Sequence, residues 1–330
     1  MRENRLTVFL RAMSMAVLAM LSCVCAAQAQ YPDKPIKVVV AWPPGSTTDT
    51  AARVISERLA QKFGQPVTVE NRPGANGTIG TSYVAKSAPD GYTLIFGTAD
   101  THSINPHVYK NLPYDAMKGF EPISLVGIVT FVLIARAGLE QSDVRELVAA
   151  AKQQPGKITY ATWGTGSTAH VSFAVLESAA GMNLLHVPYQ GAAPALNALL
   201  GSQVDLMMTG ALSADTQRKA GKAKVLGVSG SQRLPALPDV RTFAEQGVQD
   251  AHGGSWYGML APAGIPASVR DRLATEIVAI VKAPEVSQRI TGLGWSVVGN
   301  TPAEFAAFMR AELERYGKVV KSRGITIDQP

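Results

Sequence analysis

The chain has 330 residues, and its 31 Lys and Arg against 25 Asp and Glu give a formal net charge of +6 at pH 7. The positive charges are scattered and no aromatic residues interleave with them, which argues against a nucleic-acid-binding surface. Both cysteines, Cys23 and Cys25, lie in an apolar N-terminal stretch. The rest of the chain therefore has no thiol for a disulfide, a thiolate metal site or a cysteine nucleophile.

The first 29 residues predict a secretory signal peptide. Arg2, Arg5 and Arg11 precede an uncharged apolar run that ends in the small-residue sequence A-Q-A. The run is too short to span a bilayer as a helix, so we expect cleavage after Ala29 and a periplasmic location. A retained anchor, or a lipoprotein modified at Cys23, is the alternative.

Strand-like and helix-like segments alternate along the rest of the chain. Strands are predicted at residues 36–41, 66–70, 92–97, 157–161, 184–187, 204–208 and 224–229. Helices are predicted at residues 52–63, 142–152, 168–180, 192–200, 214–221, 266–282, 284–291 and 302–321. Thr301 and Glu304 form a capping-box pattern before the last helix. The alternation predicts an α/β fold with parallel-rich sheets flanked by helices.

Two segments are predicted to cross between two lobes. Residues 122–135 form a long apolar run, and residues 253–262 read G-G-S-W-Y-G-M-L-A-P. Two crossings make a hinge. The predicted organisation is a signal peptide at 1–29, lobe 1 at 30–126 and 255–330, and lobe 2 at 127–254.

Two similar turns, W-P-P-G-S-T-T-D at residues 42–49 and W-G-T-G-S-T at residues 163–168, each join a predicted strand to a predicted helix. Small residues let a ligand approach the backbone, and the unpaired amides of a helix N-terminus favour an anion. Each turn by itself is also explained by helix capping. On opposite lobes, the two turns would hold one carboxylate between them. The predicted ligand-binding residues are Trp42, Pro44, Gly45, Ser46, Thr47, Thr48, Asp49, Trp163, Gly164, Thr165, Gly166, Ser167, His170 and Asp205.

Several of these residues have a second interpretation. His170 is a cleft-facing donor or a capping histidine, and Asp205, interpreted as the end of a strand, is a ligand acceptor or a loop cap. Trp42 and Trp163 offer flat faces to an aromatic or hydrophobic carboxylate, or they belong to the cores of the lobes. The histidines show no metal-ligand spacing, so neither a metal nor a cofactor is expected.

The chain resembles the extracytoplasmic solute receptors of tripartite tricarboxylate transporters, the Bug or TctC family. The motifs that carry the resemblance are Y-P-D-K-P-I-K-V-V-V from Tyr31, P-G-S-T-T-D from Pro44, V-E-N-R-P-G-A-N-G-T-I-G from Val69, A-P-D-G-Y-T-L from Ala88, L-P-Y-D from Leu112, P-G-K-I-T-Y from Pro155, G-T-G-S-T-A-H from Gly164, V-P-Y-Q-G from Val187, L-P-D-V-R-T-F-A-E-Q-G from Leu237 and W-Y-G-M-L-A-P-A-G-I-P from Trp256. Three positions depart from the family pattern: Ser46 replaces a second Gly, Phe173 an acidic residue and Arg241 a Pro.

The resemblance implies a two-lobed periplasmic binding protein of type II, the Venus flytrap kind, without catalysis or cofactor. Its ligand would be a small carboxylate, such as a dicarboxylate, a tricarboxylate or an aromatic acid. It would act as a monomer with the membrane components of a tripartite tricarboxylate transporter. The rival functions are a ligand-sensing receptor that feeds a signalling partner and a secreted hydrolase that uses a serine of the second turn. No G-x-S-x-G sequence supports the hydrolase.

Overall fold

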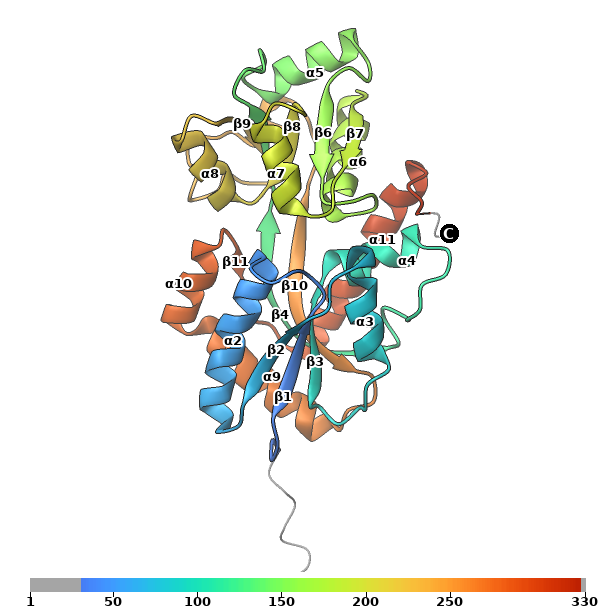
Figure 1. The fold of residues 1–330 in the computed structure, drawn as a ribbon, viewed down its shortest axis with the longest axis vertical. Coiled ribbons are helices and arrows are strands. Elements are labelled where there is room, and N and C mark those ends of the chain that lie inside the picture. Colours follow the sequence, from blue (N-terminus) through green and yellow to red (C-terminus); the bar gives the residue numbers. More distant parts are fainter. Residues whose placement is uncertain (1–30, 328–330) are drawn as a thin grey trace, which may run out of the picture.

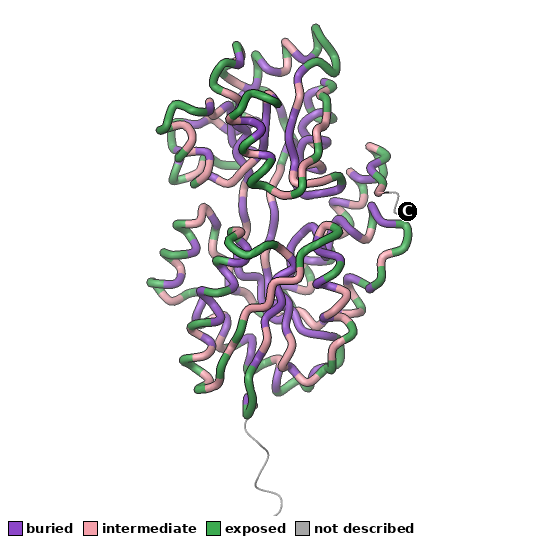
Figure 2. Tube along the Cα trace, viewed as in Figure 1, coloured by how far each residue is buried: buried purple, intermediate pink, exposed green. Residues whose placement is uncertain are grey.

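The computed structural model describes residues 31–327, so the expected signal peptide and its cleavage site lie outside the described residues. The fold is α/β and has two lobes, each built around one mixed sheet with helices on its faces (Figure 1). The strands are mostly buried, and exposed residues gather on the helices and loops around them (Figure 2). Within residues 31–327, no helix combines the length and apolar character needed to cross a membrane.

The first lobe contains a six-stranded sheet in the order β11-β4-β10-β3-β1-β2. Its strands are β1 (Ile36–Val40), β2 (Val67–Asn71), β3 (Thr93–Thr98), β4 (Phe120–Thr130), β10 (Gly254–Pro262) and β11 (Ser296–Val297). Its helical segments are α2 (Thr47–Phe63), η1 (Ala75–Gly77), α3 (Thr78–Ala85), the π-helical turn η2 (Asp100–Ile104), α4 (Asn105–Val108), α9 (Ala267–Lys282), α10 (Pro284–Gly292) and α11 (Pro302–Ser322).

The second lobe contains a five-stranded sheet in the order β7-β6-β8-β5-β9. Its strands are β5 (Val132–Arg136), β6 (Thr159–Thr162), β7 (Leu185–Pro188), β8 (Leu206–Thr209) and β9 (Ala223–Val228). Its helical segments are α5 (Val144–Gln153), α6 (Thr168–Ala180), α7 (Ala192–Leu200), α8 (Ala211–Lys219) and η3 (Ala244–Gln246).

Both sheets are mixed, with parallel and antiparallel pairs of strands. The β1 strand pairs in parallel with β2 and β3, and β6 does so with β7 and β8. The strands next to the crossings, β4, β5 and β10, form antiparallel pairs. The chain enters β5 and β10 from the other lobe rather than through a crossover helix, and β4 pairs with the returning β10.

The chain changes sheets at two adjacent points. Residues 127–130 still belong to β4 of the first sheet, and β5 of the second sheet begins at Val132. Between them, Phe131 N donates to Gly253 O at 3.3 Å, next to the start of β10. Ser229 Oγ lies within 2.8 Å of Phe131 O and 2.6 Å of Gly253 O. The two crossings are therefore hydrogen-bonded to each other, and β4 and β10 link the lobes in Figure 1.

The last helix packs across one side of the molecule. α11 has the predicted capping box, in which Thr301 and Glu304 satisfy each other's amides. Its buried Phe305, Met309 and Tyr316 face the first lobe, and its C-terminal part contacts α6 of the second lobe. The lobes therefore touch along the α6 side of the structure.

Candidate ligand-binding site

The two turns have the same local design. Each follows a parallel strand and ends in a serine N-cap: Ser46 Oγ accepts from Asp49 N at 3.2 Å, and Ser167 Oγ accepts from His170 N at 3.4 Å. The glycine before each serine has a positive φ, +78° at Gly45 and +72° at Gly166, a conformation that favours glycine. The capping interpretation is therefore confirmed for both turns, and α2 begins five residues earlier than predicted.

Asp49 belongs to the internal structure of the first turn. Its buried carboxylate accepts from Gly45 N at 2.9 Å, from Asn71 Nδ2 at 2.8 Å and from Arg53 Nε at 3.0 Å. Burial alone would raise the pKa of Asp49, but the hydrogen bonds from Arg53, Gly45 and Asn71 outweigh it and lower the pKa. Asp49 therefore shapes the turn and has little left to offer a ligand.

The amides that follow in the first turn are open. The N–H groups of Thr47 and Thr48, the first two residues of α2, donate no hydrogen bond within residues 31–327. An ideal Cβ on Gly45 would meet no atom within 4 Å. Because amides at a helix N-terminus point outward and carry partial positive charge, this end of α2 is suited to an anion.

The second turn differs, because its corresponding amide is already occupied. Thr168, the first residue of α6, donates from its backbone N to Asp100 Oδ1 at 2.8 Å and from its Oγ1 to Asp100 Oδ2 at 3.2 Å. Asp100 comes from η2 of the other lobe, just after β3. Gly166 N donates to His170 Nδ1 at 3.1 Å. Side chains of the chain itself thus occupy the first amide of α6 and the amide of Gly166, whereas Ala169 N, the second amide of α6, donates no hydrogen bond within residues 31–327.

Asp100 is a functional candidate that the sequence reasoning missed. It is 3% exposed, and burial raises its pKa to about 6, although the hydrogen bonds from Thr168 work in the opposite direction. Among residues 31–327, no Lys or Arg forms a hydrogen bond with it. The available signal was its position just past the carboxyl end of a parallel strand, because ligands of α/β sheets bind at that edge.

Tyr257 of β10 lies beside the end of β3. It pairs with Thr98, two residues before Asp100, and both burial and the charge of Asp100 raise the pKa of Tyr257. Its ring stacks on Trp295 with centroids 4.0 Å apart. Tyr257 is therefore a neighbour of Asp100 at the edge of the first sheet. The sequence assigned this segment only to a lobe crossing.

Both tryptophans are partly buried and pack against the hydrophobic core. The Trp42 indole Nε1 is buried and has no hydrogen-bond partner among the described residues, which leaves a donor beside the first turn. The Trp163 ring meets Phe131 edge-on, with centroids 5.5 Å apart, beside the lobe crossing. Binding of an aromatic or hydrophobic carboxylate against the flat face of the ring stays a prediction for both tryptophans.

His170 belongs to the interior of the second lobe. Its ring stacks on His186 with centroids 3.9 Å apart, and its Nδ1 accepts from Gly166 N. Burial and the nearby Arg323 lower the pKa of His170 to about 4, so the ring is neutral at pH 7. This geometry favours the capping interpretation of His170. A pocket of about 350 Å³, lined by His170, Glu177 and Arg323 among others, lies where α6 meets the end of α11.

Asp205 was placed wrongly at the end of a strand. It immediately precedes β8, and its Oδ2 accepts from Thr159 N and Oγ1, both at 2.9 Å, at the start of β6. Its Oδ1 accepts from Arg136 Nε at 2.8 Å. Because β6 and β8 are parallel and the second turn follows the end of β6, Asp205 lies at the opposite end of the sheet from that turn.

The second turn also lacks the geometry of a serine hydrolase. Ser167 Oγ donates to Gly164 O at 2.6 Å, and the nearest ring nitrogen in the turn, His170 Nδ1, accepts from Gly166 N instead of from a serine hydroxyl. A nucleophile needs a base within hydrogen-bond reach. In the part of the chain that the structure describes, no three His, Cys, Asp or Glu side chains gather as a metal site.

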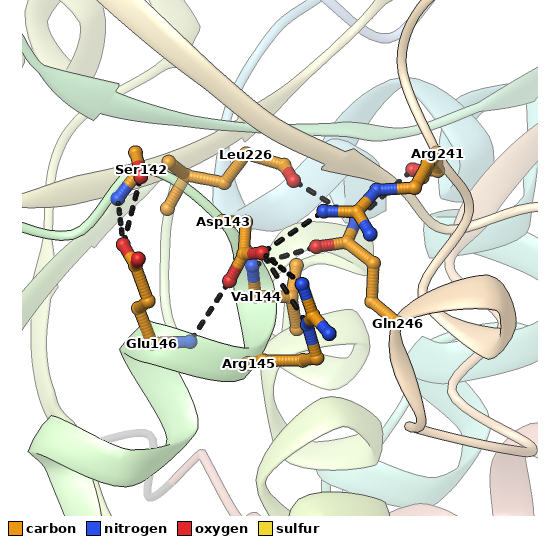
Figure 3. Close-up of polar contacts among 8 residues, drawn as sticks. All are labelled: Ser142, Asp143, Val144, Arg145, Glu146, Leu226, Arg241 and Gln246. Carbon is orange, nitrogen blue, oxygen red and sulfur yellow. Dashed lines mark hydrogen bonds and ion pairs between the residues drawn. The ribbon is translucent and has the colours of Figure 1, made fainter.

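The other two departures from the family pattern lie away from the turns. Arg241 Nη2 binds Asp143 Oδ2, the N-cap of α5, at 2.9 Å, next to Arg145 (Figure 3). Phe173 is fully buried and stacks on Tyr160 with centroids 4.0 Å apart. Both residues serve the internal packing of the second lobe.

Two lobes joined by paired crossings, with a helix N-terminus of each lobe beside them, define the class of two-lobed periplasmic binding proteins. The family model described as "Tripartite tricarboxylate transporter family receptor" matches residues 51–325, and the chain belongs to this family. The family consists of periplasmic solute receptors without enzymatic activity, and membership implies a periplasmic location.

Three similar proteins illustrate the match. A UPF0065 protein from the tcbD-tcbE intergenic region of Pseudomonas sp. (strain P51) is 35% identical over 300 residues, which cover 91% of this chain and 89% of the relative. The structure of the periplasmic binding protein BugD is 37% identical with a TM-score of 0.81, covering 90% of this chain and 99% of BugD. The structure of R. palustris Rpa4515 with adipate is 32% identical with a TM-score of 0.84 and the same coverage.

Proposed function

We propose that this receptor binds a small carboxylate between its lobes and delivers it to the membrane components of a tripartite tricarboxylate transporter. The observation that carries the proposal is the open N-terminus of α2, where the amides of Thr47 and Thr48 have no partner among the described residues. The adipate in the similar Rpa4515 structure supports a carboxylate as the ligand class.

The proposed binding step uses backbone donors. One carboxylate oxygen would accept from the first amides of α2, and the unpartnered Trp42 Nε1 lies beside the same turn. Closure of the lobes about Phe131 and Gly253 would then exclude water and strengthen these hydrogen bonds. We propose lobe 1 at residues 30–126 and 255–330, lobe 2 at residues 127–254, a monomeric receptor and a signal peptide removed after Ala29.

The test removes a single amide from the site. In Thr47→Pro, proline takes the first helical position, where its ring is tolerated, and Ser46 already has the extended conformation (φ −65°, ψ 158°) that a residue before proline adopts. Losing one hydrogen bond to a charged group costs about 1.5–3 kcal/mol. Calorimetry should therefore show carboxylate affinity reduced by at least about tenfold.

Ala267→Pro provides the matched control. Ala267 is the exposed first residue of α9 and follows Pro266, which has a similar extended conformation. This variant should bind carboxylates like the unaltered receptor. Equal affinities of Thr47→Pro and Ala267→Pro would show that the end of α2 does not hold the ligand. A receptor that binds no carboxylate at all would refute the proposed function.

A further inference from the structure

We propose that Asp100 sets the ligand class: the receptor takes a carboxylate whose other end bears an amino or hydroxyl group, and it rejects a second carboxylate there. This inference rests on the proposed function, because it describes the far end of the same ligand. Instead of two turns that hold one carboxylate between them, the site has two different halves. The end of α2 receives an anion, and the end of α6 already holds one.

The first support is the unusual electrostatic state of Asp100. Asp143 also sits at a helix N-terminus, but Arg145 and Arg241 both pair with it at its N-cap position, as Figure 3 shows. Asp100 is more deeply buried, and within residues 31–327 only uncharged groups donate to it. A buried carboxylate without a cation strongly disfavours further negative charge and favours an incoming donor or cation.

The second support is the position of Asp100 between the turns. It is hydrogen-bonded to Thr168 of the second turn, and it follows β3, which pairs in parallel with β1, the strand that leads into the first turn. A ligand whose carboxylate lies on the α2 amides would therefore direct its other end toward Asp100.

The third support is the hydrogen-bonding capacity that Asp100 retains. A carboxylate has about four acceptor positions. Among residues 31–327, Thr168 is the donor to Asp100 and uses two of these positions. The remaining positions can accept from a hydroxyl or an ammonium group on the ligand. A second ligand carboxylate supplies only acceptors and a like charge.

The proposal implies a pH dependence above pH 6.5. The pKa of Asp100 is about 6, so it gains charge as the pH rises and should repel a dicarboxylate increasingly. The other titratable groups nearby do not change charge in this range. Burial places the pKa of His102 at about 3 and that of His170 at about 4, and it raises the pKa values of Tyr257 and Tyr316.

The experiment compares matched ligands by calorimetry. Succinate, glutarate and adipate are tested against the ω-amino and ω-hydroxy monocarboxylates of the same backbone lengths, with the unaltered receptor, Asp100→Asn and Asp143→Asn. Asparagine keeps an acceptor for Thr168 N and removes the charge. We expect the unaltered receptor to bind the amino or hydroxy acids with at least about tenfold higher affinity than the dicarboxylates. In Asp100→Asn, the ratio of these two affinities should shift toward the dicarboxylates by at least about tenfold.

The controls separate the two proposals. Asp143→Asn should leave the ratio unchanged. Dicarboxylate affinity of the unaltered receptor should fall roughly twentyfold from pH 6.5 to 8.0, and that of Asp100→Asn should stay flat. An unchanged ratio in Asp100→Asn, or an equal change in affinity for every ligand, would overturn the role of Asp100 and leave the carboxylate receptor standing. Failure of all these carboxylates to bind the unaltered receptor would overturn both.

Discussion

Replacing Asp100 by Asn should stabilise the protein at neutral pH. Burial raises the pKa of Asp100 from its ordinary 3.8 to about 6. A group whose pKa is raised by folding contributes to the stability of the folded state. This contribution is complete below the pKa of the group in the unfolded chain, and it is lost as the pH rises through the pKa of the group in the folded protein. The charged form of Asp100 therefore weakens the folded state above pH 6, and Asn removes this charge.

The difference between the two pKa values sets the size of the effect. One pKa unit corresponds to roughly 1.4 kcal/mol, so the difference between the folded and the unfolded pKa of Asp100 corresponds to about 3 kcal/mol at neutral pH. Asn is expected to keep the hydrogen bond from Thr168 N, so little of this gain should be lost to a broken contact. The advantage of Asp100→Asn should be near zero at pH 4, grow between pH 4 and pH 6.5, and remain constant at higher pH.

Urea unfolding of both proteins between pH 4 and pH 8 measures this difference. Asp143→Asn is the control with the opposite sign, because hydrogen bonds from Glu146 N and Arg145 and the charge of Arg241 lower the pKa of Asp143 below its ordinary value despite burial. That variant should lose stability at neutral pH. If the stability difference between Asp100→Asn and the unaltered protein does not depend on pH, the electrostatic argument for Asp100 is refuted.

Four further variants test the structural roles assigned to the second lobe and the turns. Ser46→Ala and Ser167→Ala should each cost about 1 kcal/mol in urea unfolding, because each removes a helix N-cap, and losses near zero would contradict the capping geometry. Phe173→Glu should cost at least about 3 kcal/mol, since it buries a charge in the stack with Tyr160. Native circular dichroism and an unchanged unfolding midpoint would contradict that assignment. Arg241→Pro should cost at most about 1 kcal/mol, because its ion pair is partly exposed. Calorimetry should show unchanged ligand affinity, and a changed affinity would contradict its assignment to the internal structure of the second lobe.

The strand and helix order followed from local patterns. Ser46 and Ser167 precede their helices as capping residues, and Thr301 and Glu304 formed a recognisable capping box. These signals depend on residues a few positions apart, so the sequence displays them directly. Asp205 was misplaced because a strand boundary error of a few residues moves a side chain to the other end of a sheet.

The sequence by itself determined the two capped turns, the alternation of strands and helices, and the resemblance that identified the receptor family. Only the tertiary structure decided that the turns are unequal, because the partner of Thr168 is Asp100, 68 positions away in the chain and on the other lobe. Local patterns describe which amides a helix leaves open. Whether a distant side chain fills them depends on how the lobes pack, and here that packing leaves the first amide of α2 open and fills the first amide of α6.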